Sequence, residues 1–485
     1  MSKSPHPARF TSGSTMRHVV VMTATGSLGL IAIFIVDALN LFYISMLGVQ
    51  ELAAAIGFAG TLMFFTISVS IGLTVATSAL VSRALGRGDR EQAARTGGAA
   101  IAFVLLVTGL VAAAMWPFIG TLVRLVGATG ETADLATYFM QIVVPSSPIV
   151  SVGMCTTGIL RGTGDARRAM YVTLAGGIAA AILDPLLIFG LDLGLTGAAI
   201  STVLSRMVLV LVGLYGAWYV HRLVRLPGPA QLMRAARPFF GVGIPAIMTQ
   251  VATPVGNAYV TIEMAAFGDD AVAGWAIIGR LIPVAFGSIF ALSGAVGPIL
   301  GQNYGARLYD RLHLVLRDAL VLTFIYVSVV WLLLALLSGQ IAALFGATGD
   351  AHDLVIFFCL FAAGSFLFNG ALFVGIAAFN NLGFATYSTL FNWGRATLGT
   401  IPFVSVGAVY YGAEGVIAGW GLGGVLFGLL SVIIGFRVIR RVANRPPPDD
   451  GNLPGPPPTA NSPFSTGKAA TAGYTAGTAE SSSPS

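Results

Sequence analysis

The chain has 485 residues, of which 56% are hydrophobic and 9% are charged, and its formal net charge at pH 7 is +6. An average soluble domain carries about 25% charged residues, so this composition excludes a soluble globular protein and indicates that lipid covers much of the surface. The basic residues fall in short clusters between apolar runs, which excludes the continuous basic face of a nucleic-acid-binding protein.

Apolar runs follow one another along almost the whole chain. The first comes after a polar start and is too long for the apolar core of a secretory signal, so we expect it to remain as a membrane span. A spanning helix needs about 20 mostly apolar residues, and this length predicts about twelve spans. They are 19–46, 52–82, 97–122, 135–160, 170–190, 196–220, 238–266, 271–300, 318–340, 354–379, 386–410 and 413–437.

Arginine is distributed unevenly between the loops that join these spans. One alternating set of loops, with the C-terminal flank, is rich in arginine, whereas the other set is short and poor in it. The positive-inside rule therefore predicts a multi-pass protein of the cell membrane with both termini in the cytoplasm, which requires an even number of spans. The arginines of the rich set include Arg83, Arg87, Arg90, Arg95, Arg161, Arg167, Arg168, Arg222, Arg225, Arg307, Arg311, Arg317, Arg440 and Arg441.

The two halves of the sequence resemble each other. The segment Val-Gly-Ala-Thr-Gly-Glu at 126–131 returns as Phe-Gly-Ala-Thr-Gly-Asp at 345–350, 219 residues later, and weaker matches follow in order at offsets of 217–220. Because six spans is an even number, both halves share one orientation. We therefore expect an all-α polytopic membrane protein, with about twelve transmembrane helices in two pseudo-symmetric six-helix bundles and a solute path between them.

The same pattern predicts domain boundaries. We expect a cytoplasmic N-terminal tail at 1–16, a first bundle at 17–222, a cytoplasmic linker at 223–237 and a second bundle at 238–440. The segment 446–485 begins with three prolines and has almost no large apolar residue, so it is predicted to be a disordered cytoplasmic tail.

Ionisable side chains within spans cost several kcal/mol to bury in lipid, so each is a candidate functional residue. At 1.5 Å per residue, Asp37, Asp184 and Thr202 lie roughly 8–16 Å below the same membrane boundary. Their oxygen atoms would suit a proton or cation site in the first half. The alternative is structural: each carboxylate pairs with an arginine or caps a broken helix, and Pro185 disturbs the helix beside Asp184 in either case.

The other ionisable residues are expected to be structural. Glu263 lies near a helix end, and Arg206, Arg280 and Arg395 are expected to pair internally or to stabilise helix ends. In the second half, Asn257 aligns with Asp37 under the repeat. We place Asn257 and Gln250 in the substrate cavity.

No catalytic constellation accompanies these residues. The sequence has no phosphate-binding P-loop, no His/Cys cluster at metal-binding spacing and no Gly-x-Ser-x-Gly element. We therefore expect no enzyme activity, no cofactor and no dedicated metal site.

The sequence resembles the MATE family (multidrug and toxic compound extrusion), closest to its DinF-type bacterial branch, over roughly residues 17–440. The matching pieces are 36–38 with 47–48, 83–89, 158–165, 183–186 and 197–200. The resemblance implies a V-shaped pair of six-helix bundles that alternates between the two faces of the membrane. It also implies export of organic cations or other amphiphiles in exchange for protons or sodium.

Members of this branch hold the coupling ion at an acid in span 1, an Asn and an Asp in span 5, and a Thr in span 6. Asp37, Asp184 and Thr202 match this pattern, whereas Ala180 occupies the position of the Asn. The missing amide oxygen favours a proton over sodium, with Na⁺ at Asp37, Asp184 and Thr202 as the alternative.

One alternative function stays open beside this one, and an enzyme is not expected. A lipid-linked oligosaccharide flippase of the same superfamily is the alternative transporter, and such chains usually have more spans and a strongly cationic cavity. A membrane-embedded enzyme would need a catalytic cluster. The expected partners are the lipid bilayer and small amphiphilic or cationic molecules, with no nucleic acid, and the expected state is a monomer.

Overall fold

The computed structural model describes residues 8–46 and 50–444, apart from a few side chains within helices, among them that of Asp37. This part of the chain is helical almost throughout and contains no strand. Eleven of its helical segments are long and apolar enough to cross a membrane. Large apolar side chains such as Leu110 and Leu211 are exposed on them, as expected where lipid covers the surface. The predicted all-α polytopic fold is confirmed.

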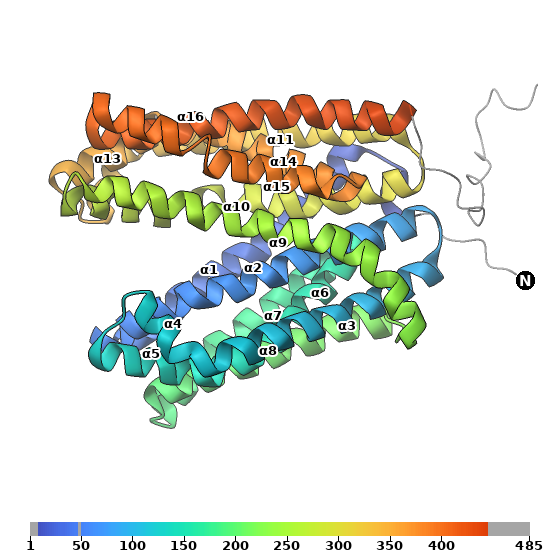
Figure 1. The fold of residues 1–485 in the computed structure, drawn as a ribbon, viewed down its shortest axis with the longest axis horizontal. Helices are drawn as coiled ribbons and strands as arrows, with labels where there is room; N and C mark the ends of the chain where they lie inside the picture. Colours follow the sequence, from blue (N-terminus) through green and yellow to red (C-terminus); the bar gives the residue numbers. More distant parts are fainter. Residues whose placement is uncertain (1–7, 47–49, 445–485) are drawn as a thin grey trace, which may run out of the picture. The chain divides into compact units, whose positions relative to one another are not determined.

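The helices of each half follow in chain order (Figure 1). The first half contains α1 (Thr15–Ser45), α2 (Gln50–Gly86), α3 (Arg90–Met115), α4 (Ile119–Leu125), α5 (Gly130–Val143), α6 (Ser147–Thr163), α7 (Ala166–Pro185) and α8 (Gly194–Leu214). The second contains α9 (Pro229–Ala265), α10 (Asp269–Gly305), α11 (Tyr309–Leu336), α12 (Ser338–Leu344), α13 (Gly349–Leu360), α14 (Phe366–Leu382), α15 (Ala385–Ala396) and α16 (Ile401–Asn444).

The internal repeat is visible in the helix boundaries. The helices α2 and α10 begin 219 residues apart, and the same interval separates the starts of α3 and α11, of α5 and α13, and of α7 and α15. The residues before α5 and α13 also share one extended backbone conformation, with φ −133° and ψ 159° at Thr129 and φ −132° and ψ 162° at Thr348. The sequence repeat is therefore also a repeat of helix order and, before α5 and α13, of backbone geometry.

The last long segment turns back on itself. At Gly412 the backbone has a φ of +58°, which is outside the helical range. Beyond this point the chain runs antiparallel to its preceding part, because the backbone of Gly415 contacts Gly407 and that of Gly423 contacts Gly399. The eleven candidate segments therefore correspond to the twelve predicted spans, two of which lie in this hairpin.

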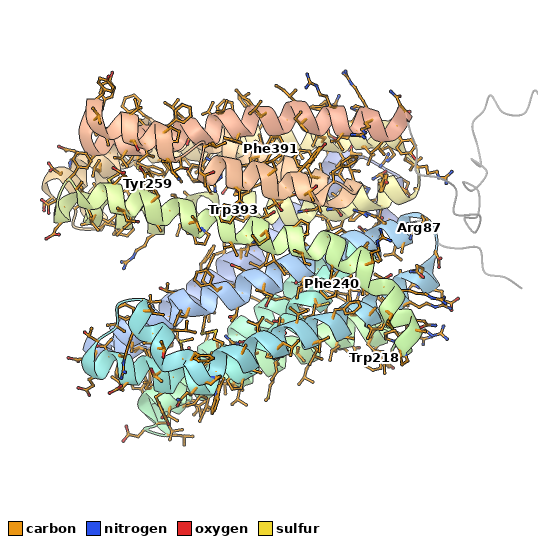
Figure 2. The ribbon with its side chains drawn as sticks, in the orientation of Figure 1. Arg87, Trp218, Phe240, Tyr259, Phe391 and Trp393 are labelled. Carbon is orange, nitrogen blue, oxygen red and sulfur yellow. The ribbon has the colours of Figure 1, made fainter. Side chains whose placement is uncertain are left out.

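The helix pattern does not test the predicted domain boundaries, which stay predictions, and the tail predicted at 446–485 lies outside the described residues. The segment that leads into the second half packs on the first half. The ring centroid of Phe103 in α3 lies 5.1 Å from that of Phe239 and 5.1 Å from that of Phe240, both in α9 (Figure 2).

Arginines gather at the end of the structure where α2, α6 and α10 finish, which we call the arginine-rich end. Arg87 lies there in Figure 2. The other end, where α2 and α10 begin, is called the opposite end.

Asp165 lies in the turn between α6 and α7 at the arginine-rich end and stabilises it through hydrogen bonds. Its side chain caps α7 by accepting a hydrogen bond from the backbone N–H of Arg168 (3.1 Å), and its Oδ2 lies 2.8 Å from Nε2 of His221. Partial burial acts to raise the pKa of Asp165, but the hydrogen bonds from His221 and Arg168 outweigh it and hold the pKa below its ordinary value.

We expect Asp165→Ala to lower the free energy of unfolding by about 1–2 kcal/mol at pH 7, because the cap and the charged partners are lost together. A carboxylate whose pKa is lowered by folding stabilises the protein above its unfolded pKa, near 4, and loses this effect as the pH falls further. Thermal unfolding in detergent should therefore show a difference that shrinks below about pH 4. If the wild-type protein and Asp165→Ala differ in stability by the same amount at pH 7 and below pH 4, the effect is due to the helix cap and not to the charge.

Candidate functional site

The carboxylate of Asp184 lies buried near the end of α7, and only 1% of the residue is exposed. Its Oδ2 accepts a hydrogen bond from Nδ2 of Asn40 in α1 (3.0 Å), whereas its Oδ1 is buried with no partner among the described atoms. Pro185 follows and cannot donate a backbone hydrogen bond, and the chain continues as a π-helical turn, Leu186–Gly190. A buried carboxylate with one free oxygen is a chemically reasonable place for a proton or a small cation.

Asn40 is a site residue that the sequence analysis missed. It lies three residues after Asp37 in α1, so the two positions share one face of the helix. An amide at this spacing within an apolar span was the available signal. Asn40 brings an amide group to Asp184 from α1, while Ala180, in α7 itself, has none to offer.

The remaining predicted site residues are not joined to Asp184 by any described contact. Thr202 is partly buried in α8, and its hydroxyl donates to the carbonyl oxygen of Ala198 (2.9 Å). Asp37 lies in α1, but its side chain is outside the described residues. The grouping of Asp37, Asp184 and Thr202 therefore stays a prediction.

Two of the three arginines predicted within spans have internal partners. In α8, Arg206 donates to the carbonyl oxygen of Val143 (3.1 Å) and to Oγ of Ser146 (2.7 Å). In α15, Arg395 donates to Oγ1 of Thr253 in α9 (3.1 Å). Both are buried, and their predicted structural role is confirmed.

The prediction was wrong for Arg280. This residue is exposed on α10, and its guanidinium has no hydrogen bond or ion pair with any described residue. The sequence alone could not separate it from Arg206, because both interrupt strongly apolar runs.

The predicted cavity residues both lie in α9. Asn257 is exposed and Gln250 is partly buried, and the described hydrogen bonds involve neither side chain. Nearby, Nε1 of Trp393 in α15 donates to the carbonyl oxygen of Met248 (2.9 Å; Figure 2). The placement of Asn257 and Gln250 in a substrate cavity stays a prediction.

The two halves meet closely at the arginine-rich end. Arg83 of α2 donates through Nε to the carbonyl oxygen of Asn381 (2.9 Å) and through Nη2 to that of Asn380 (2.7 Å), both in α14. Gln302 of α10 donates to the carbonyl oxygen of Gly162 in α6 (2.7 Å). These bonds hold helices of one half directly against helices of the other.

Two glycines make this approach possible. A Cβ atom added at Gly86 would lie 2.1 Å from the carbonyl oxygen of Gln302, and one added at Gly305 would lie 2.1 Å from that of Arg83. Gly86 and Gly305 are 219 residues apart, as are Arg83 and Gln302. The contact is therefore reciprocal between repeat-related positions, as a two-fold relation between the halves requires.

The segment before α1 adds a second connection at this end. The backbone N–H of Phe10 donates to Oε1 of Gln302 (2.9 Å), and Nη1 of Arg9 donates to the carbonyl oxygen of Gly164 (2.9 Å). Arg311 of α11 donates to the carbonyl oxygen of Phe10 (3.1 Å), and Phe10 is only 1% exposed. Residues 9–11 thus bridge both halves.

Comparisons with known proteins agree with this architecture. A family model described as MatE matches residues 27–186 and 245–406. A Shewanella oneidensis protein named FAD transporter is 27% identical over 434 residues, which cover 88% of this chain and 95% of that protein. The multidrug export protein MepA of Staphylococcus haemolyticus is 26% identical over 426 residues, which cover 85% of this chain and 91% of that protein.

Solved structures show the same fold. A mutant of a Vibrio cholerae MATE transporter superposes with a TM-score of 0.84 at 22% identity, covering 89% of this chain and 99% of that one. A multidrug resistance MATE family transporter in an outward-facing conformation also gives 0.84, at 23% identity and with coverage of 92% and 100%.

Proposed function

Because the chain belongs to the MATE family, whose members are ion-coupled antiporters and not enzymes, we propose that it exports small amphiphilic or cationic organic molecules from the cell by proton-coupled antiport. The observation that carries this proposal is the buried carboxylate of Asp184 within the matched region, whose Oδ1 has no hydrogen-bond partner among the described residues. The protein is a multi-pass membrane protein, and we place it in the cell membrane as a monomer.

The surroundings of Asp184 favour a proton as the coupling ion. Asn40 donates a hydrogen bond to the carboxylate, and the side chain of Ala180 has no oxygen. A cation such as sodium prefers several oxygen ligands, whereas a proton needs a single basic oxygen, which Oδ1 provides. We propose Asp37 as a second acid of the same site, because it lies on the α1 face that carries Asn40, and Thr202 as a neighbouring hydroxyl.

Alternating access is the proposed transport cycle. By the positive-inside rule the arginine-rich end faces the cytoplasm. The bonds of Arg83 and Gln302 across the halves, and the bridge at Phe10, support a conformation closed on that side. For substrate to enter from the cytoplasm, these contacts must break and the two halves must separate there.

The coupling ion can be tested with purified protein in liposomes that contain a fluorescent organic cation. We expect export driven by a pH gradient in sodium-free buffer, little export driven by a sodium gradient at equal pH, and none from Asp37→Asn. Robust export in the sodium condition alone would overturn the proton assignment. Failure to export any amphiphile under either gradient would argue against the antiporter itself.

A second candidate function is export of an anionic solute, such as the flavin nucleotide named for the Shewanella oneidensis relative. Arg280, an exposed arginine with no described partner within a membrane-spanning helix, favours it. Negative charge is also what an oligosaccharide flippase would have to accommodate, so that alternative stays open beside it. The same liposomes loaded with an anionic dye provide the test: export of the cation alone would dismiss this candidate.

A further inference from the structure

Arg161 is a second arginine without a described partner, and it lies where the two halves meet. It belongs to the last turn of α6, is partly buried, and makes no hydrogen bond or ion pair through its guanidinium with any described residue. Its Nη1 lies 2.7 Å from where a Cβ of Gly294 in α10 would stand. The guanidinium of Arg161, in the first half, therefore faces α10 of the second half.

A narrow pocket surrounds this guanidinium. Helices α1, α6, α7 and α10 line it. The hydroxyls of Thr25 and Thr173 are part of the lining, and each donates to a backbone carbonyl oxygen of its own helix, Val21 (2.7 Å) and Met170 (2.8 Å). Gly26 and Gly29 of α1 keep the lining small, since neither has a side chain to fill it. No carboxylate lines the pocket, so nothing described there neutralises Arg161. A buried guanidinium with no carboxylate beside it is suited to bind a phosphate or a carboxylate.

Arg280 lies on the same face of α10, farther from the arginine-rich end. Arg280, Gly287 and Gly294 are spaced at seven residues, which is about two helical turns. A Cβ at Gly287 would lie 3.5 Å from the Phe34 ring of α1, so this face is turned toward the first half. Arg280 stands 11 residues into α10, about 16 Å along the helix, where facing lipid would be costly. We therefore assign its exposed side chain to the aqueous space between the halves.

We propose that Arg161 and Arg280 form a binding path for the anionic group, a phosphate or carboxylate, of a transported solute. This inference rests on the second candidate function proposed above, export of an anionic solute by the same antiporter, and names the residues that would bind that solute. Arg161 would engage the anionic group when the arginine-rich end opens and the pocket widens. Arg280 would receive it farther along the same face of α10. Neither guanidinium has an acidic partner among the described residues, because the transported solute supplies the negative charge.

The test uses two flavins that differ by one phosphate. Full-length protein in lipid-free maltoside detergent is titrated with FMN and with riboflavin, and binding is followed by quenching of flavin fluorescence. We expect FMN to bind about tenfold more tightly than riboflavin, the equivalent of one charge-assisted hydrogen bond. Arg161→Gln and Arg280→Gln should each reduce or remove this preference while riboflavin affinity stays within about twofold. Arg124→Gln, an exposed arginine 3.5 Å from Asp134, is the matched control and should change neither.

A second variant leaves the charge of Arg161 in place, so that loss of binding cannot be attributed to removal of the arginine. Gly294→Ala would place a methyl group against the Arg161 guanidinium, and we expect it to weaken FMN binding while Arg161 remains. A lipid headgroup shares the phosphate chemistry, so phosphatidylglycerol is added in a separate arm. Competitive displacement of FMN by this lipid, with no FMN transport in liposomes, would assign the site to lipid and overturn the proposal.

The failures of the two proposals are distinguishable. Equal affinities for FMN and riboflavin in the wild-type protein, or no binding of either, together with intact export of an organic cation, would overturn the anion path and leave the antiporter proposal in place. No export of either kind would count against the antiporter itself.

Discussion

Asp184→Asn is expected to reduce gradient-driven export to the level of empty liposomes. The substitution keeps the shape of the side chain and an oxygen that can still accept the hydrogen bond of Asn40, so the packing of α7 against α1 should survive. What it removes is the ability of residue 184 to bind and release a proton. Export assays in liposomes under a pH gradient measure the effect, and size-exclusion chromatography in detergent checks the fold.

Two comparisons sharpen this expectation. Asn40→Ala leaves Asp184 ionisable but without its described partner, so we expect export to be slowed rather than lost. Arg206→Gln removes a buried arginine that bonds to Val143 and Ser146 outside the proposed site, and should act mainly on stability. Export by Asp184→Asn at the wild-type rate would show that the carboxylate is structural.

Much of the fold was predictable because bilayer thickness imposes a length on every span and lipid imposes an apolar surface. These constraints act locally, so they can be read from consecutive residues. The repeat added long-range information: the paired Val-Gly-Ala-Thr-Gly-Glu and Phe-Gly-Ala-Thr-Gly-Asp segments predicted that the two halves repeat, and the residues Thr129 and Thr348 before α5 and α13 have nearly the same backbone angles.

The site was less predictable because its contacts join residues that are far apart in sequence. Asn40 and Asp184 are separated by 144 positions, and the pairing depends on the rotation of α1 about its axis, which a weakly amphipathic membrane helix does not reveal. The different environments of Arg206, Arg280 and Arg395 depend on packing in the same way. Hydropathy gives the depth of a charge, but it does not show whether the charge faces a neighbouring helix, lipid or water.

The segment before α1 illustrates the same limit. The polar residues at 1–16 predicted only a tail. Phe10 is nevertheless buried between helices of both halves, because Gln302 and Arg311 satisfy its backbone N–H and carbonyl groups. A single aromatic residue in a polar stretch carries too little signal to predict such a contact.

At the arginine-rich end, α2 and α10 lie so close at Gly86 and Gly305 that a side chain at either position should prevent the contact. A Cβ at Gly86 would meet the backbone of Gln302, which cannot move aside as the end of a flexible side chain could. We therefore expect Gly86→Val to hold the two halves apart at this end and to abolish export, since a carrier that cannot close on one side cannot complete its cycle. Gly305→Val should have the same effect, because a Cβ at Gly305 would meet the backbone of Arg83 in the same way.

Opening can be measured separately from export. Ser82 is fully buried where α2 meets α10, so a cysteine placed there by Ser82→Cys reports whether the contact has separated. With the buried Cys155 and Cys359 replaced by alanine, a membrane-impermeant maleimide should label this cysteine faster in Gly86→Val than in its parent.

Gly109→Val is the control, because a Cβ at Gly109 in α3 meets nothing within 4 Å, so the added bulk should alter neither labelling nor export. Slow labelling with wild-type export in Gly86→Val would mean that the helices can meet without this glycine. Fast labelling with wild-type export would mean that closure at this contact is not part of the transport cycle. Because valine adds the same atoms at both positions, a difference between the two variants can be attributed to the contact between the halves.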